Sequence, residues 1–125
     1  MKWNFDNERA IYSQIVEQIK LFIISGYYEK GSKLPSVRDL AEEAKVNPNT
    51  MQKALAELER QGLIYSNRTT GNFITDDENL IKNVKKEFAD DKIREFISYM
   101  KNLGYDKQDT VKLLENYETG GNENE

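Results

Sequence analysis

Apolar positions recur with helical spacing in five stretches of this chain, and residues that favour turns separate the stretches. They cover residues 10–25, 36–44, 47–60, 80–103 and a last segment that follows Asp106. Apolar residues three and four positions apart lie on one face of a helix, so the pattern predicts five amphipathic helices.

The second and third of these helices are short, and a tight turn joins them. Ser36 suits the N-cap of the first, with Asp39 in the place that Glu or Gln takes in a capping box. Asn47 suits the N-cap of the second, and Pro48 its first helical position. Two such helices, the second with a polar start, predict a helix-turn-helix, whose second helix enters the DNA major groove.

Two β-prone segments, residues 63–66 and 72–75, follow the helix-turn-helix and flank a five-residue turn. This arrangement predicts a hairpin, which at this place in the chain is a wing. The expected fold class is therefore mainly α with a small β wing: a winged helix-turn-helix domain followed by two C-terminal helices. Near the N-terminus, Trp3-Asn4-Phe5 fits either a short strand or a hydrophobic latch.

The last two helices carry an apolar face that one small domain cannot easily cover. We expect this face to pair with a second copy of the chain; the alternative is that it folds back on its own domain. The Asp90–Asp91 pair is a candidate for a kink or break in the longer helix. The expected dimerisation residues are Ile81, Val84, Phe88, Phe96, Ile97, Met100 and Leu103.

These elements divide the chain into three expected parts. Residues 1–75 form the DNA-binding domain, residues 76–119 the helical dimerisation region, and residues 120–125 a disordered tail. The tail contains only Gly, Asn and Glu, which cannot supply a packed core.

Several short sequence motifs within residues 1–75 are specific in their order and spacing. They are Ile11-Tyr12-Ser13-Gln14-Ile15, Lys33-Leu34-Pro35-Ser36, Arg38-Asp39-Leu40-Ala41, Val46-Asn47-Pro48-Asn49-Thr50, Leu58-Glu59-Arg60-Gln61-Gly62-Leu63-Ile64 and Gly71-Asn72-Phe73-Ile74. With them the chain resembles the DNA-binding domain of the GntR family of bacterial transcription regulators. The Asn-Pro-Asn-Thr form and the short C-terminal part resemble the YtrA-like branch. The resemblance implies a winged helix and pairing into a dimer.

The resemblance also implies which side chains meet DNA. The arginine of the Leu-Pro-Ser-x-Arg word, here Arg38, contacts DNA in the family, and its fork matches phosphate or a guanine edge. Side-chain amides at the start of the recognition helix can pair with adenine, and the methyl group of Thr50 can touch thymine. The expected DNA-binding residues are Ser36, Arg38, Pro48, Asn49, Thr50, Gln52, Lys53, Arg68, Thr69 and Thr70.

Three positions in this set differ from the pattern of many relatives. Arginine is frequent where this chain has Pro48 or Gln52, so the base preference does not carry over from them. At the wing tip Thr69 replaces a glycine that lets the backbone approach the minor groove. Lys53 fits a phosphate contact and a solvated helix face equally well.

The charge balance is unusual for a protein that binds a polyanion, since the net charge is −4. Residues 1–75 carry 10 Lys and Arg against 9 Asp and Glu, whereas residues 76–125 carry 8 against 13. The acidic excess therefore lies in the C-terminal part. DNA binding depends on where the positive groups lie and not on their total.

Composition excludes several other classes of function. The chain has no cysteine and no histidine, which removes thiolate metal sites and the commonest general base. We therefore expect no enzyme, no metal and no cofactor. No segment has the apolar character of a signal peptide or a membrane span, so a cytoplasmic location is the default expectation.

Together these features predict a sequence-specific regulator that binds double-stranded operator DNA as a homodimer. We expect a repressor of an inverted-repeat operator, and the YtrA-like branch implies a transporter operon as its target. The C-terminal part is too short for a dedicated effector pocket. The alternative is a winged-helix module that binds a partner protein without sequence-specific DNA binding.

Overall fold

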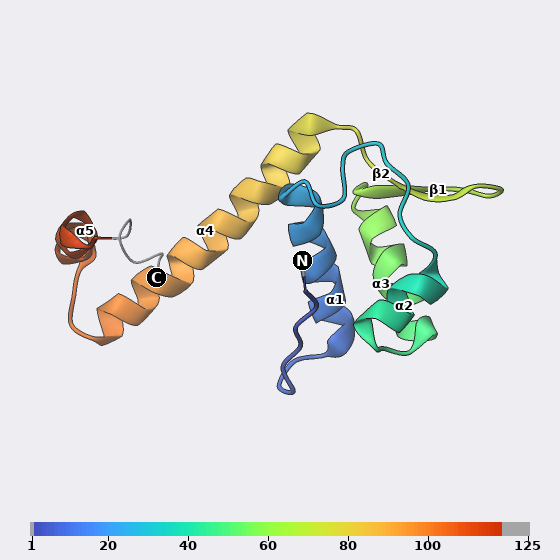
Figure 1. The fold of residues 1–125 in the computed structure, drawn as a ribbon. Coiled ribbons are helices and arrows are strands. Elements are labelled where there is room, and N and C mark those ends of the chain that lie inside the picture. Colours follow the sequence, from blue (N-terminus) through green and yellow to red (C-terminus); the bar gives the residue numbers. More distant parts are fainter. Residues whose placement is uncertain (1, 119–125) are drawn as a thin grey trace. The chain divides into compact units, whose positions relative to one another are not determined.

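The computed structural model describes residues 2–118, which form five helices and one two-stranded antiparallel sheet (Figure 1). This architecture confirms the predicted fold class. The elements are α1 (Ile11–Ile24), α2 (Val37–Ala44), α3 (Pro48–Arg60), β1 (Ile64–Asn67), β2 (Gly71–Ile74), α4 (Glu78–Asn102) and α5 (Lys107–Asn116). The predicted tail, residues 120–125, lies outside the described residues.

The chain forms two compact units, Met1–Lys85 and Lys86–Glu125, and the division falls inside α4. The first unit therefore extends ten residues beyond the boundary expected at residue 75. The reason is that the first turns of α4 contact the winged helix. Leu80 packs against the Gly62 backbone, with its Cδ2 atom 3.4 Å from where a β-carbon added to Gly62 would lie. Val84 is buried, and Glu78 forms an ion pair with Lys30.

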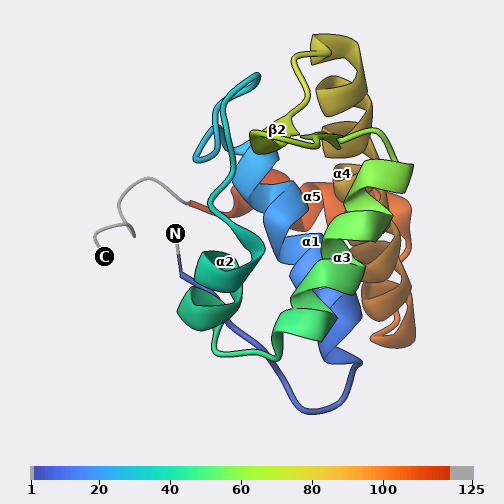
Figure 2. The ribbon, with the colours of Figure 1, turned by 90° about the vertical axis from the view of Figure 1, so that its right-hand side faces the viewer.

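The core of the first unit lies among its first three helices and the hairpin. α3 packs against both α1 and α2, and Figure 2 shows α1 and α3 side by side. Removing these apolar side chains from water is the main favourable contribution to folding. The largest fully buried apolar side chains are Ile15, Ile19, Leu40, Met51, Leu58, Leu63 and Ile74.

Local capping fixes where α2 and α3 begin, as the sequence predicted. Ser36 Oγ accepts a hydrogen bond from the Asp39 N–H at 3.0 Å, and Asn47 Oδ1 accepts one from the Asn49 N–H at 2.7 Å. Between the helices Lys45 adopts a left-handed backbone with φ 59°, and the Val46 N–H bonds to the Ala41 carbonyl at 3.0 Å. This Schellman-type turn ends α2 and redirects the chain into α3.

The N-terminal segment is a latch and not a strand. The Trp3 ring meets the buried Phe22 edge to face, with ring centroids 5.0 Å apart. The Asn4 N–H donates to Gln18 Oε1 at 2.8 Å. Gln14, which is 1% exposed, donates to the carbonyls of Asp6 and Arg9 and accepts from the Asp6 N–H. These bonds hold the segment against α1.

The predicted hairpin is present, and each of its strands lies one residue nearer the turn than predicted. Asn67 pairs with Gly71, so the tip contains three residues instead of five. The segment before α2 also pairs with β2, because the Leu34 N–H bonds to the Asn72 carbonyl at 2.9 Å and the Ile74 N–H to the Ser32 carbonyl at 2.8 Å. This third short segment fixes the base of the wing.

α4 continues through Asp90 and Asp91, so the break considered there is wrong. Lys86 bonds to Asp90 at 3.0 Å and Arg94 pairs with Asp91, and such pairs one turn apart support a helix. In α5 Asp106 forms a capping box with Asp109. Within residues 2–118 no helix has the length and apolar character needed to cross a membrane.

Candidate nucleic-acid interface

The N-terminal half of α3 presents a polar face. Pro48, Asn49, Gln52 and Lys53 are exposed and Thr50 is half-buried, whereas the apolar positions of the same helix face the core. Pro48 has no N–H, and the Asn49 N–H is already bonded to Asn47. Backbone donors at this helix start are therefore fewer than helix geometry alone suggests, and recognition rests on side chains.

Lys53 has a partner that the sequence did not reveal. Its ammonium lies 4.6 Å from the centroid of the Tyr12 ring, which α1 supplies. This cation–π contact positions the charge on the exposed face of α3 and leaves it in solvent.

The start of α2 and the base of the wing meet in an open hollow. Its lining residues are Lys33, Leu34, Pro35, Ser36, Val37, Asp39, Thr70, Gly71 and Asn72. The structure thus brings together Ser36 and Thr70, two predicted DNA-binding residues that are far apart in the sequence. Sequence reasoning missed Lys33, although it immediately precedes the Leu-Pro-Ser word. The Lys33 side chain lies against Gly71, with its Cε atom 3.2 Å from where a β-carbon added to Gly71 would lie.

The wing tip consists of Arg68, Thr69 and Thr70, all exposed. Asn67 Oδ1 accepts hydrogen bonds from the Thr69 N–H at 3.1 Å and from its hydroxyl at 3.0 Å. In the wing, Gly71 has a positive φ of 106°, whereas Thr69 has a negative φ that any residue can adopt. Threonine in place of the family's glycine therefore causes no backbone strain.

The five arginines of the chain fall into two groups. Arg9, Arg60 and Arg94 each form ion pairs with nearby carboxylates. In the described part of the chain Arg38 and Arg68 form none, and both are exposed. These two charges lie on α2 and the wing, the elements that adjoin α3 in the fold. They are the arginines available to an anionic partner.

The C-terminal end of α3 contrasts with its start. Hydrogen bonds from Arg60 and then from Gln61 lower the pKa of Glu57 to about 2. Glu57 is thus a carboxylate at neutral pH, and it neutralises Arg60 locally. This end of the helix offers little attraction to a polyanion.

The structure separates the predicted dimerisation residues into three groups. Val84 is buried within the single chain, while Ile81, Phe88, Ile97 and Met100 are half-buried. Phe96 and Leu103 are exposed, at 40% and 57%. The other exposed large apolar side chains of the second unit, within the described residues, are Ile93, Tyr99, Tyr105, Val111, Leu113, Leu114 and Tyr117.

Across residues 2–118 the acidic side chains form no group that could hold a metal ion. The carboxylates instead cap helices or pair with basic side chains.

Comparison with known proteins places the same segment in a described family. The family model of bacterial regulatory proteins of the gntR family matches residues 11–74. The uncharacterized HTH-type transcriptional regulator YhcF of Bacillus subtilis is 33% identical over 94% of this chain and 97% of its own length. The HTH-type transcriptional repressor YtrA of the same organism is 47% identical over 53% of this chain and 51% of its own.

Solved structures give the same result. A GntR family transcriptional regulator from Listeria monocytogenes is 41% identical and superposes with a TM-score of 0.84, covering 91% of this chain and all of that one. A structure of AraR(DBD) in complex with operator ORX1 covers 60% of this chain and 99% of that one, with 27% identity and a TM-score of 0.52. The relatives are named as regulators and not as enzymes, as the sequence predicted. This chain therefore belongs to the GntR family of bacterial regulatory proteins, on its YtrA-like branch, and contains the family's winged helix-turn-helix DNA-binding domain.

Proposed function

We propose that this protein is a transcriptional repressor that binds an inverted-repeat operator as a homodimer. The observation that carries the proposal is the distribution of arginines around α3. Arg38 and Arg68, which form no ion pair within residues 2–118, lie on the two elements beside the exposed polar start of this helix. Phosphate contacts supply much of the affinity for DNA, and base-edge contacts supply specificity.

Each element of the interface then has its own role. Asn49, Thr50 and Gln52 on α3 read base edges in the major groove, and Lys53, held over Tyr12, contacts phosphate. Pro48 packs against the backbone at the same helix start. The remaining contacts come from α2 and the wing: Ser36, Arg38, Arg68, Thr69 and Thr70, to which we add Lys33.

The second unit supplies the homodimer contact in this proposal. Phe96 is exposed on α4 and Leu103 just after its last residue, with Ile97 and Met100 half-buried near them in sequence. A self-complementary apolar face is typical of two-fold interfaces, and a dimer matches the two-fold symmetry of an inverted repeat. Val84 is not included, because the single chain already buries it.

The proposed sign and target of regulation rest on likeness to relatives. YtrA is named a repressor. Resemblance to the YtrA-like branch implies that the target is a transporter operon, and we place the protein in the cytoplasm.

Binding of genomic DNA fragments tests the proposal directly. The purified protein should retain a small set of fragments that share an inverted repeat, with affinity that falls steeply as salt rises. The control is the same fragment with its repeat shuffled. Equal binding of native and shuffled fragments at physiological salt would show that the protein is not sequence-specific.

A further inference from the structure

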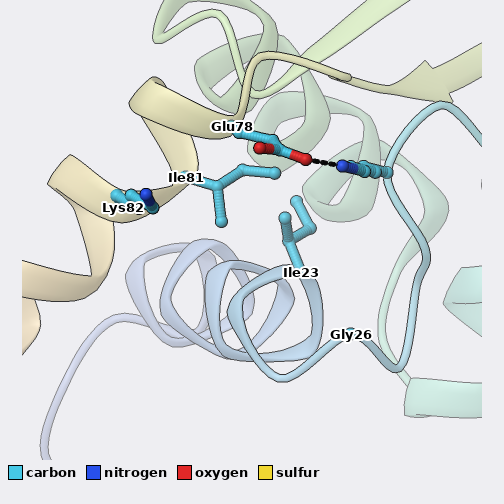
Figure 3. A pocket seen from close by; sticks show the side chains of 6 residues that line it. Ile23, Gly26, Glu78, Ile81 and Lys82 are labelled. Atoms are coloured by element: carbon cyan, nitrogen blue, oxygen red, sulfur yellow. Dashed lines mark ion pairs between the residues drawn. The ribbon is translucent and has the colours of Figure 1, made fainter.

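A small hollow lies in the first unit between the end of α1 and the first turns of α4 (Figure 3). It encloses about 260 Å³. Ile81 extends from α4 towards Ile23 on α1, so the two side chains make its apolar floor (Figure 3). The lining residues are Ile23, Gly26, Lys30, Glu78, Ile81 and Lys82. None of them belongs to the proposed DNA interface.

The two lysines at this hollow differ in their partners. Lys30 forms an ion pair with Glu78, drawn as a dashed line in Figure 3. Lys82 has no carboxylate within ion-pair distance in the part of the chain that the structure describes. The hollow thus combines an apolar floor with one cation that nothing neutralises. Its chemical complement is an apolar molecule with a single acidic group.

We propose that the hollow binds a small aliphatic carboxylate, with its chain between Ile23 and Ile81 and its acidic group at Lys82. Drug-sized ligands occupy pockets of roughly 300–1,000 Å³, so this hollow suits a smaller molecule. The site is independent of the operator contacts.

Chain length provides the first test, with butanoate, hexanoate and octanoate titrated into the full-length protein and followed by amide NMR shifts. Burying one methylene group should tighten binding about fourfold, until the hollow is full. The shifts should be largest around Gly26 and Ile81. Octylamine, with an equal chain and the opposite charge, should bind more weakly than octanoate.

Two lysine variants on the same helix provide the second test. Lys82→Gln should weaken octanoate binding about two- to fivefold, the range expected for an exposed ion pair. Lys85→Gln is the matched control, because Lys85 is exposed on α4 but does not line the hollow. The control should leave octanoate binding unchanged. Both variants should keep the melting temperature, since these are surface positions.

Three results would overturn the proposal. The first is no saturable octanoate binding at millimolar concentration. The second is equal affinity for octanoate and octylamine, or equal effects of the two lysine variants. The third is that Ile81→Glu converts a dimer to a monomer while octanoate binds neither form, because a second copy of the chain would then be the occupant of the hollow.

Discussion

The two units of this chain use apolar residues in opposite ways. In the first, three helices and a hairpin enclose Ile15, Leu40, Met51 and Leu58, which are fully buried. In the second, Thr110 is the one buried residue within residues 86–118, while Phe96, Tyr99 and Leu114 are exposed. The winged helix completes its own core, whereas the exposed apolar side chains of the second unit form the face that we propose a second copy of the chain covers.

The largest effect is expected when a charged residue replaces an exposed apolar side chain in the second unit. Phe96→Glu should convert the dimer to a monomer and reduce operator affinity by about 10²–10⁴-fold, because the second half-site is no longer bound intramolecularly. A fragment ending at Lys85 should behave similarly and remain folded, since the first unit ends there. Light scattering and operator titration measure the two effects. A fragment that remains dimeric would refute this role for the second unit.

Within the first unit, arginines with and without ion pairs should respond differently. Arg38→Ala should weaken operator binding by about 5- to 150-fold, the range for one good contact to a base edge. Arg60→Ala is the control, because Arg60 already pairs with Glu57. Fluorescence anisotropy with labelled operator gives the affinities, and Arg38→Ala should not change thermal stability. If Arg60→Ala weakens operator binding as much as Arg38→Ala does, then the absence of an ion pair does not identify the arginines that contact DNA.

A buried amide tests how self-sufficient the first unit is. Gln14→Leu leaves the carbonyls of Asp6 and Arg9 and the N–H of Asp6 without their partner. We expect the free energy of unfolding to fall by about 1–3 kcal/mol, measured by urea denaturation of the Lys85 fragment. Gln18→Leu, at a more exposed position, should lower the free energy of unfolding by less. Equal losses in the two variants would show that burial does not set the cost.

The smallest expected effect is a pH dependence at the end of α3. The folded-state pKa of Glu57 is about 2, below its ordinary value of 4.5, because Arg60 and Gln61 donate to its carboxylate. The stabilisation is therefore fully present above pH 4.5 and is lost as pH falls towards 2. Melting temperatures across this range should converge for wild type and Glu57→Gln at the acidic end. Parallel curves would show that the carboxylate contributes nothing.

Features that depend on neighbours in sequence could be predicted, and features that depend on distant contacts could not. Ser36, Asn47 and Asp106 cap helices through bonds to residues two or three positions away, so their roles follow from the sequence alone. The division after Lys85 could not be predicted, because it arises where α4 meets α1 and the turn at Gly62.

The candidate interface shows the same limit. The recognition helix and wing were identified by residue type and spacing, together with the family's sequence words. The position of Lys33 beside Gly71 depends on pairing between the segment before α2 and β2, which no local pattern indicates. The cation–π partner of Lys53 likewise comes from another helix, through Tyr12.

The N-terminal latch makes the sole tryptophan of the chain a built-in optical probe. Trp3 contacts Phe22 in α1, and its indole N–H lies 3.5 Å from Glu43 Oε1 in α2. Detachment of the latch would expose the indole to water and shift its emission to longer wavelength. Trp3 fluorescence therefore monitors the winged helix without an added dye, while circular dichroism records the helices of both units in the same sample.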